Sequence, residues 1–367
     1  MTSYVCHPQS LEQFVHQACV AVGADDDIAA EVAHHLVRAN LSGHDSHGVL
    51  RLPWYVEQIK KGDLQPNARP TIVREHGATA VMDAHRGFGQ YTTYVGLEWA
   101  MDAARKYGLG AVAIRHSTHI GRLGEYSERA TAAGMIAMVT VGSVTPGAGI
   151  VVPFGGRERL LGTNPWSIGV PASGHEPMIF DAATSTIAEG KLRVARSKHA
   201  EVTPGFIVDK AGHATTSPED FYSGGALLPL GGAPSGHKGY GLSMASALVG
   251  ALSSIDDDDA NPAGSAFAQA QPDTTGRAGG VFVLVIDPAA FGDSNAYAAK
   301  NGAALNAANR VAPAPGFDAV LAPGEPEVRS RAARGEAGIP LPDTIWNDLA
   351  AVAEHTGITM PEARQEA

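Results

Sequence analysis

The chain has 367 residues, more than one simple hydrophobic core usually supports, so its length favours two interlocked domains. Its formal charge of −11 argues against nucleic acid and anionic membranes as partners, because both bind clustered Lys and Arg. Only two cysteines occur, Cys6 and Cys19, which is too few for a disulfide framework and suits a reducing, cytoplasmic compartment. The first seven residues lack a signal-peptide pattern, and glycine and proline interrupt the most apolar stretch, 134–152, so we expect no membrane span.

The first 75 residues are predicted to be helical. Ser10 is the predicted N-cap of a first helix, which carries Leu11, Phe14 and Ala18 on one face and stops at Gly23. A second helix is predicted from Asp25–Asp27 to about residue 40, and a third over 52–61. The stretch 42–48 between them is rich in turn-forming polar residues and is predicted to be a turn.

From residue 78 onward, patterns typical of strands alternate with patterns typical of helices, which indicates an α/β protein. Strands are predicted at 78–83, 111–115, 136–141, 166–170, 178–181 and 281–287. Helices are predicted at 91–107, 123–133, 186–196, 240–252, 295–309 and 342–355. The small and polar stretch 260–278 is predicted to be an exposed loop.

Three glycine-rich stretches imitate phosphate-binding motifs without meeting their requirements. Residues 87–92 lie between a predicted strand and helix, but Thr92 takes the place of the third glycine, and no acidic residue ends a second strand roughly twenty residues later. Residues 108–113 follow a helix and enter a strand, the reverse of the required order, and suit a helix C-cap. Residues 232–239 lack the strand and the Ser or Thr of a P-loop.

Four histidines, His34, His35, His44 and His47, lie close together in the sequence, and with Asp45 they could in principle bind zinc. Their spacing matches no common structural zinc site, and no further ligand of the right type lies nearby. We therefore expect no metal.

The stretch from Asp45 to Arg51 carries the residue types that reduction of an oxo acid requires. Histidine, here His47, can donate a proton near neutral pH, and the neighbouring hydroxyl of Ser46 can relay that proton or orient the ring. The guanidinium of Arg51 can bind a carboxylate with two hydrogen bonds. If the backbone is helical after Gly48, His47 and Arg51 share one helix face. The alternative is a polar turn that only caps the next helix.

Further candidate sites lie at junctions between predicted strands and helices. The segment His116–Gly124 offers backbone N–H groups and Arg122 to a phosphate or ribose, and His119 as another proton donor, although a capped helix start explains the same pattern. Polar residues at 161–165 and 181–185 follow strand ends, where they can line a cleft or cap a helix. Lys238 precedes an apolar helix and could pair with a phosphate, or it is merely solvated.

Taken together, these stretches resemble the malate/L-lactate dehydrogenase family of the second type, which includes ureidoglycolate dehydrogenase, 2,3-diketogulonate reductase, sulfolactate dehydrogenases and Δ1-piperideine-2-carboxylate reductase. The resemblance runs in order along nearly the whole chain. It is carried by the motifs Asp45–Pro53, His119–Gly121, Val152–Gly156, Gly162–Pro165, Asp181–Ser185, His237–Leu242, Pro313–Phe317 and Ala322–Glu325.

The resemblance implies an α/β fold without a Rossmann domain. A mixed-sheet NAD(P)-binding domain would span 76–305, and a helical domain would form from residues 1–75 together with 306–367. It also implies a homodimer, NAD or NADP as cofactor and a small carboxylate as substrate.

The resemblance further implies roles for individual residues. His47 would be the proton donor with Ser46 as its relay partner, although some members assign the acid/base role to the histidine matching His119. The substrate would contact Arg51, Thr163, Glu189 and Gly190. The cofactor would be held by His119, Ile120, Gly121, Arg122, Leu123, Asp181, Ala182, Ala183, Lys238, Pro323, Gly324 and Glu325.

The implied reaction is hydride transfer between NAD(P)H and a 2-oxo acid of the malate, lactate or sulfolactate type. One departure bears on the substrate, because the cyclic-imine reductases of the family have a charge-relay aspartate where this chain has Lys191. A cyclic imine such as Δ1-piperideine-2-carboxylate, or ureidoglycolate, is the alternative substrate. A metabolite- or nucleotide-binding protein without catalysis is the alternative outside enzymes.

Overall fold

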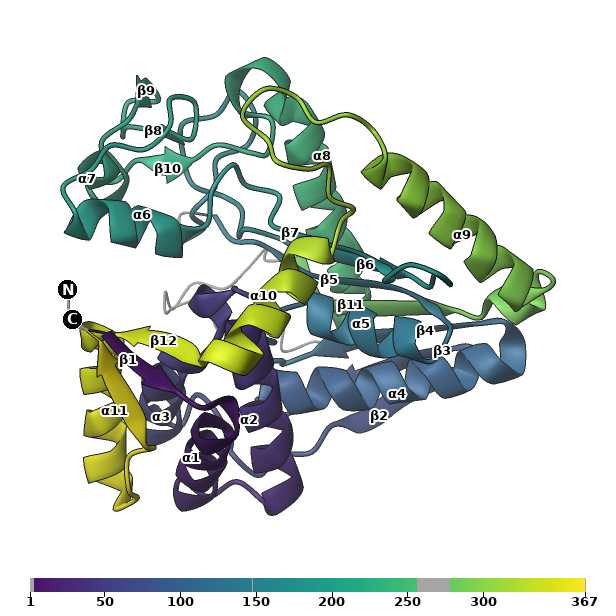
Figure 1. The fold of residues 1–367 in the computed structure, drawn as a ribbon, viewed down its shortest axis with the longest axis horizontal. Coiled ribbons are helices and arrows are strands. Elements are labelled where there is room, and N and C mark those ends of the chain that lie inside the picture. The colour runs from purple at the N-terminus through teal and green to yellow at the C-terminus, as the bar shows by residue number, and fades with distance from the viewer. Residues whose placement is uncertain (1–2, 147, 256–277, 367) are drawn as a thin grey trace.

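The computed structural model describes residues 3–146, 148–255 and 278–366, and its centre is a seven-stranded mixed sheet (Figure 1). The strand order is β2-β3-β4-β11-β5-β6-β7. The strands are β2 (Thr71–His76), β3 (Thr79–Asp83), β4 (Leu109–Arg115), β5 (Ile136–Val144), β6 (Trp166–Val170), β7 (Met178–Ala182) and β11 (Ala278–Ile286). Within this sheet β3 and β4 pair in parallel, and the other described pairs are antiparallel. The α/β class expected from the sequence is confirmed.

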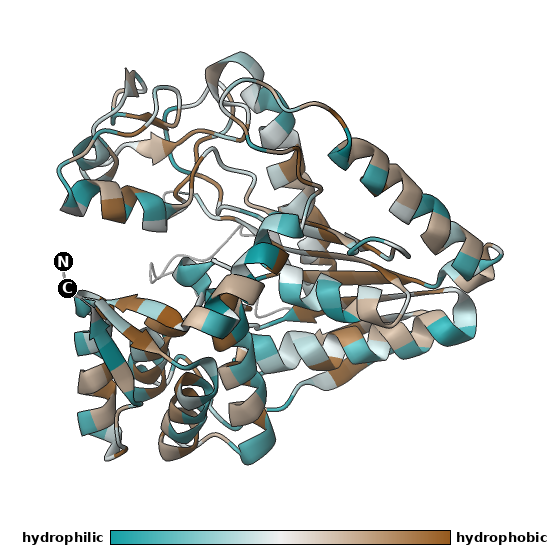
Figure 2. Cartoon of the chain, in the orientation of Figure 1, coloured by the Kyte–Doolittle hydropathy of each residue, from teal (hydrophilic) through white to brown (hydrophobic). Residues whose placement is uncertain are grey.

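Helices cover both faces of this sheet because successive side chains of a strand point to opposite sides. Ala137 and Val139 of β5 belong to the core cluster that includes residues of α4 (Gly89–Tyr107) and α5 (Gly124–Ala132). On the opposite face, Thr140 donates a hydrogen bond to Ser246 of α8 (Gly232–Gly250), and Gly142 leaves no room for a side chain against that helix. Figure 2 shows hydrophobic residues along the central strands, whereas the outer helix α9 (Ser294–Asn309) mixes hydrophilic and hydrophobic residues.

Both ends of the described chain meet in a second, three-stranded sheet of order β12-β1-β13 (Figure 1). Its strands are β1 (Ser3–Cys6), β12 (Ile339–Pro342) and β13 (Ala363–Glu366). Next to it one apolar cluster combines residues of α1 (Pro8–Ala21), α2 (Asp26–Leu41), α3 (Leu52–Lys61) and α11 (Asp343–Thr356). This cluster also includes Phe88 and Tyr91, which lie beyond residue 75. The domain boundaries at residues 75 and 305 stay a prediction.

A smaller region contains the short helices α6 (Glu189–Ser197) and α7 (Pro218–Tyr222) and the strands β8 (Ile207–Val208), β9 (Ala214–Thr215) and β10 (Ala226–Leu227). One hydrophobic cluster there consists of Val151, Leu161, Leu192, Ile207, Phe221 and Leu227, and a second consists of Val152, Val208 and Ala226. Among the described helices, none combines the length and apolar character that crossing a bilayer requires.

Several predicted element limits were wrong. The first helix begins at Pro8, because His7 rather than Ser10 is the N-cap and accepts a hydrogen bond from the Gln9 N–H. Within the first 75 residues, β1 and most of β2 are strands rather than helix. The helix predicted from residue 186 begins only at Glu189, as α6. The helix predicted from residue 240 begins eight residues earlier, at Gly232, as α8, although its first turns are rich in glycine. The helix α10 (Glu325–Ala337) was not predicted.

The structure confirms the interpretation of residues 108–113 as a helix end that leads into a strand. Gly108 lies in the left-handed region at φ +85°, caps α4 with a hydrogen bond to the Ala104 carbonyl, and is followed directly by β4. Glycine suits this position because it alone adopts positive φ without steric strain. The predicted loop at 260–278 falls almost wholly outside the described residues.

Candidate active site

One pocket brings together predicted catalytic, substrate and cofactor residues from three separate segments. His47 reaches it from a short 3-10 turn at Asp45–His47, His119 from the connection between β4 and α5, and Thr163 from the turn before β6. Ile120, Gly121 and Leu123 also line it, and the remaining wall is mostly small or apolar: Thr118, Val141, Gly142, Ser143, Thr145, Ala148, Gly149, Ile150, Gly162, Asn164 and Pro165. About 770 Å³ of empty space lies within it when open solvent is included.

Asn164 holds the Thr163 turn in place. This buried asparagine adopts a left-handed backbone conformation at φ +39°. Its Oδ1 accepts a hydrogen bond from the Ser143 N–H (2.9 Å), and its Nδ2 donates to the Ser243 carbonyl (3.0 Å). The Thr184 hydroxyl donates to the Thr163 carbonyl at 2.9 Å. Thr163 therefore lies at a rigid part of the pocket wall, as a substrate contact requires.

The two candidate proton donors lie side by side. The rings of His47 and His119 are stacked, with centroids 5.6 Å apart and planes 18° apart. The Ser46 hydroxyl is hydrogen-bonded to His47 Nδ1 at 3.0 Å, and the Tyr55 hydroxyl to His119 Nδ1 at 2.7 Å. Each ring is thus oriented through Nδ1 by a neighbouring hydroxyl, as the sequence predicted for Ser46.

Tyr55 and Gln90 are site residues that the sequence analysis missed. Gln90 Nε2 donates to the Tyr55 oxygen at 2.6 Å, which leaves the hydroxyl proton for His119 Nδ1. Both side chains are buried. The spacing could have indicated Tyr55, because Tyr55 follows Arg51 by one helical turn and so lies on the same side of the chain.

Burial favours the neutral form of both histidines. Burial, together with the positive charge of Arg51, lowers the pKa of His47 to about 3. Burial, Arg51 and His47 likewise hold the pKa of His119 well below its ordinary value. A neutral imidazole is ready to accept a proton, and a bound anion beside it favours the protonated form.

Arg51 reaches the His47 turn in a different way from the one predicted. Gly48 is extended (φ −88°, ψ −154°) and separates the 3-10 turn of His47 from a second one at Val49–Arg51, so the two residues do not share one helix face. Instead, Arg51 Nε donates to the Ser46 carbonyl at 2.7 Å. This hydrogen bond brings the guanidinium back beside the turn. The effect of Arg51 on the pKa of both histidines follows from this proximity.

The predicted substrate residues Glu189 and Gly190 lie at the start of α6, opposite the same turn. A Cβ atom placed on Gly190 would lie 3.4 Å from the Ser46 Cβ, so the two segments lie close together. The carboxylate of Glu189 accepts hydrogen bonds from the Tyr222 hydroxyl (2.8 Å) and from Arg193 (3.1 Å). Lys191 is exposed on the same helix.

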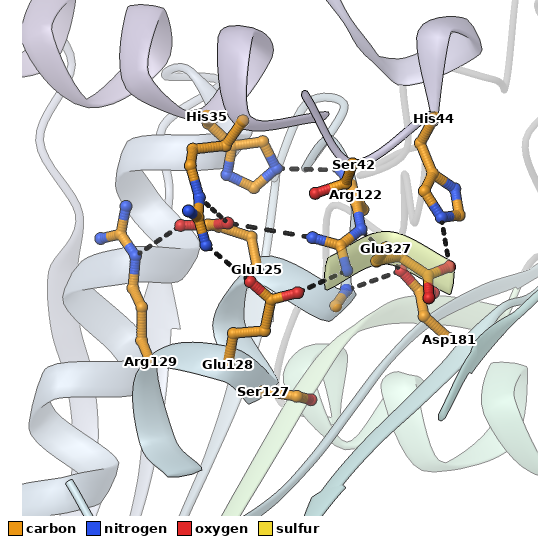
Figure 3. A network of polar contacts seen from close by, with 12 residues as sticks. His35, Ser42, His44, Arg122, Glu125, Ser127, Glu128, Arg129, Asp181 and Glu327 are labelled. Atoms are coloured by element: carbon orange, nitrogen blue, oxygen red, sulfur yellow. Dashed lines mark hydrogen bonds and ion pairs between the residues drawn. The ribbon is translucent and has the colours of Figure 1, made fainter. Parts of the chain in front are cut away.

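The segment His116–Gly124 was expected to offer backbone N–H groups to an anion, but two of these groups bond to side chains elsewhere in the protein. The Arg122 N–H donates to His35 Nε2 at 2.9 Å (Figure 3). The Gly124 N–H donates to Asp181 Oδ2 at 2.7 Å. The aspartate carboxylate therefore already occupies the N-terminus of α5. A carboxylate at this place is suited to accept hydrogen bonds from ribose hydroxyls rather than to neighbour a phosphate.

Arg122 itself is buried with a single strong partner. Its side chain is 1% exposed, and Nη2 donates to Glu128 at 2.7 Å. Nε and Nη1 have no hydrogen-bond partner among the described residues, although Asp181 lies 3.8 Å from Nε and Glu125 lies 3.9 Å from Nη1. Buried donors without acceptors are costly, and they fit a site that a polar ligand completes.

The remaining predicted cofactor residues fall into two places. The Pro323 carbonyl accepts a hydrogen bond from the Ile179 N–H (3.0 Å), so the Pro323–Glu325 turn lies against β7. The same strand carries Asp181 and ends at Ala182, and Ala183 follows it directly. The Glu325 carboxylate accepts from Asn309 (2.8 Å) and from the Ala322 N–H (2.6 Å), and so stabilises that turn. Lys238 is exposed on α8. Neither Lys238 nor Arg122, Asp181 or the Pro323–Glu325 turn is among the residues that line the pocket.

His35 supports the pocket wall from α2 and gives a prediction about stability. It is fully buried, and burial lowers its pKa to about 3. Because the unfolded state has the higher pKa of about 6.5, it takes up a proton first as the pH falls, so stability is lost below that value. His35 alone is expected to lower the free energy of unfolding by about 2 kcal/mol between pH 7 and pH 5. Urea denaturation at several pH values measures this loss.

The variant His35→Gln isolates the contribution, since glutamine can still accept the Arg122 hydrogen bond but does not titrate. Its free energy of unfolding should depend less on pH than that of the unmodified protein over this range. His34 has the opposite shift, to a pKa of about 9, so its contribution grows as the pH falls from 7 through 6.5 and is the same in the compared proteins. Replacement of the exposed His213 by Gln serves as the control. Equal pH dependence in all three proteins would contradict the prediction.

Within the described residues, no group of three or more His, Cys, Asp or Glu side chains has an arrangement that could hold a metal ion. His34 and His44, two of the four histidines considered for zinc, are instead paired with carboxylates. His34 lies 3.4 Å from Glu12, and His44 lies 2.9 Å from Glu327.

Comparison with known proteins gives the family. Hydroxycarboxylate dehydrogenase B of Escherichia coli (strain K12) is 35% identical over 362 residues, which are 98% of this chain and 96% of that protein. The crystal structure of malate dehydrogenase from Entamoeba histolytica superposes with a TM-score of 0.88 at 28% identity, over 98% of this chain and all of that one. The Δ1-piperideine-2-carboxylate reductase of Pseudomonas syringae gives a TM-score of 0.80 at 30% identity, over 95% and 99% of the two chains.

Other relatives matched over most of their length are named malate, L-lactate, L-sulfolactate and ureidoglycolate dehydrogenases. The sequence model of malate/L-lactate dehydrogenase matches residues 6–350. The family resemblance noted from the motifs is confirmed: this chain belongs to the malate/L-lactate dehydrogenase family.

Proposed function

We propose that this protein transfers a hydride reversibly between NAD(P)H and a small 2-oxo acid, with the matching 2-hydroxy acid as the product. The single observation that carries the proposal is the pocket in which His47, His119 and Thr163 meet, with Arg51 tied to the same turn as His47. Proton donors and a carboxylate anchor beside a mostly apolar wall are what reduction of an oxo acid needs. Membership of a dehydrogenase family supports it.

The residues present fit a nicotinamide cofactor. Arg122 has two buried donor nitrogens that make no hydrogen bond within the described chain, Asp181 offers a carboxylate to ribose, and Ile120, Gly121 and Leu123 line the pocket. When bound, the cofactor supplies the hydride. We propose that these residues hold it without a Rossmann domain, a proposal that the largely antiparallel order of the large sheet supports. Both NAD and NADP remain candidates.

Each protein group has a defined task in this proposal. Arg51 binds the substrate carboxylate, because its guanidinium lies beside the turn and its Nε is already fixed by the Ser46 carbonyl. His47 moves the proton at the substrate oxygen, and Ser46 orients its ring through Nδ1. His119, stacked on His47 and oriented by Tyr55, is the alternative proton donor. In the oxidation direction the neutral ring accepts the hydroxyl proton.

Three 2-oxo acids are the leading substrates: oxaloacetate, pyruvate and sulfopyruvate, the partners of malate, lactate and sulfolactate. The names of several relatives support this choice. Lys191, where the cyclic-imine reductases of the family have an aspartate, makes an imine the second choice. Ureidoglycolate is a further alternative because two relatives carry that name.

A substrate panel tests the proposal. The purified protein is mixed with NADH or NADPH and with each oxo acid, a cyclic imine or, in reverse, ureidoglycolate, and absorbance of the reduced cofactor is followed. Oxidation of one cofactor by an oxo acid is the expected result. Turnover of the imine alone would move the assignment to the imine reductases. Cofactor binding without turnover of any compound would indicate a binding protein and overturn the proposal.

We also propose a homodimer in the cytoplasm, with domains of residues 76–305 and of 1–75 together with 306–367. Cys6 and Cys19 are both free and buried, which supports a reducing compartment. The shared apolar cluster of α1, α2, α3 and α11 supports a domain made from both ends of the chain. Light scattering and limited proteolysis would test the dimer and the boundaries.

A further inference from the structure

One face of α10 is devoted to polar contacts with the segment that leads into the catalytic turn. Ser330 and Arg331 follow Glu327 by three and four residues, and Arg334 follows them by four and three, so all four lie on the same side of the helix. All four bond to residues 40–45, immediately before Ser46 and His47. Helices more often bury apolar side chains against a neighbour, whereas no described residue of α10 is fully buried and the helix makes polar contacts here. Arg331 also pairs with Glu128 of α5 at 2.9 Å.

The first three contacts hold the approach to the turn. His44 Nε2 lies 2.9 Å from Glu327 (Figure 3), the Ser330 hydroxyl donates to the Leu41 carbonyl at 2.8 Å, and Arg331 donates to the Ser42 hydroxyl at 3.0 Å.

The fourth contact grips the turn itself. Arg334 bonds Asp45 through both ends of its guanidinium, with Nη1 2.6 Å from Oδ1 and Nη2 3.1 Å from Oδ2. Nη1 also donates to the Asn40 carbonyl. Such two-point pairing fixes orientation as well as distance.

Asn40 completes the arrangement and connects it to the far side of the turn. Its Nδ2 donates to Asp45 at 2.7 Å, and its Oδ1 accepts from the Val49 N–H at 2.8 Å. Gly48 packs so closely on this carboxamide that an added Cβ would lie 2.1 Å from Oδ1. Ser46 and His47 are therefore enclosed between two points, Asp45 and Val49, that the same group of side chains holds.

We propose that Arg334 is a positioning residue for the reaction: from α10 it clamps Asp45 and so keeps Ser46 and His47 facing the pocket. The inference rests on the proposed function. The Asp45 side chain is 47% exposed and that of Arg334 is 22% exposed, so solvent screens their ion pair and the pair contributes little to the stability of the whole fold. The clamp acts on the geometry of one turn, and displacement of a catalytic group by about 1 Å can lower a rate by as much as 100-fold.

The test compares Arg334→Ala with a matched control on the same helix, Arg329→Ala, whose side chain is exposed. Arg334→Ala is expected to lower kcat/KM about tenfold or more, while the melting temperature and the affinity for NADH, measured by fluorescence, stay near those of the unmodified protein. Arg334→Lys, which keeps the charge but not the planar fork, should recover part of the loss. An unchanged kcat/KM in Arg334→Ala, or an equal loss in Arg329→Ala, would overturn the inference.

A double-mutant cycle with Asp45→Asn distinguishes a clamp from two unrelated effects. If the two side chains act through each other, Asp45→Asn combined with Arg334→Ala should be no slower than the slower single variant, within about twofold. If the fold-losses of the two single variants multiplied in the double variant, the clamp would be contradicted.

A spectroscopic readout separates this inference from the proposed function. In protein labelled with ¹⁵N-histidine, the signals of His47 are those missing from the His47→Gln variant. They should shift in Arg334→Ala and not in Arg329→Ala. If the unmodified protein reduces no oxo acid, the proposed function fails, and this comparison still decides whether Arg334 positions the His47 turn. Identical His47 signals in all three proteins would refute it.

Discussion

Replacement of His47 by Gln is expected to lower kcat for oxo-acid reduction by about 100- to 10,000-fold, the usual contribution of a general acid or base. Glutamine fills a similar space and can keep a hydrogen bond to Ser46, but it cannot carry the proton. The affinity for NADH should change little, because the other lining residues of the pocket remain. Steady-state kinetics of the substrate found in the panel measure the effect.

Two comparisons make this prediction sharp. His213→Gln, at a side chain that is 81% exposed, should keep the kcat of the unmodified protein. His119→Gln tests the second ring of the stack. If His47→Gln kept full turnover and His119→Gln lost it, the acid/base role would pass to His119, and His47 would be reduced to a packing partner.

Replacement of Arg51 by Met is expected to raise KM for the oxo acid about 10- to 100-fold, since hydrogen bonds to charged groups contribute about 1.5–3 kcal/mol. Methionine keeps much of the volume and none of the charge. A smaller decrease in kcat should accompany the change in KM, because the bond from Arg51 Nε to the Ser46 carbonyl is lost as well. The charge also lowers the pKa of His47, so its removal should shift the acidic limb of the pH profile upward.

An ester of the same oxo acid shows whether the lost contact was to the carboxylate. The unmodified protein should prefer the acid to its ester strongly, and Arg51→Met should prefer it weakly. Arg105→Ala, at an exposed arginine of α4 paired with Asp102, is the control for loss of a positive charge. If Arg51→Met still discriminated between acid and ester as strongly as the unmodified protein, the substrate carboxylate would have to bind elsewhere.

Local patterns were enough to predict most elements of the large sheet. Both ends of β6 (Trp166–Val170) were predicted correctly, because turn residues bound its alternating apolar pattern. The predicted start of α8 was eight residues late, since glycines in its first turns lower helix propensity while packing against β5 and β11 decides the outcome. β1, β12 and β13 are four residues long and pair only across the length of the chain, so no local signal marks them.

In the candidate site, too, residues with a local sequence signal were predicted, and contacts between distant parts of the chain were not. His47, His119 and Thr163 were predicted, and the structure places all three around one pocket. The contact between Asp45 and Arg334 joins residues 289 apart in the sequence, and only the folded chain brings them together. The N–H groups of Arg122 and Gly124 were predicted to be available to a ligand for the same reason. In the folded chain they donate hydrogen bonds to His35 and Asp181.

Transfer of deuterium tests the central proposal most directly. The protein is incubated with the oxo acid and with NADH, or NADPH, that carries deuterium on either face of nicotinamide C4, and the product is analysed by mass spectrometry and NMR. Our account predicts a 2-hydroxy acid with deuterium bound to C2, from one of the two labelled faces, and no such product with His47→Gln beyond a trace. A reduced product without deuterium at C2 from either face, or no reduction at all, would contradict hydride transfer in this pocket.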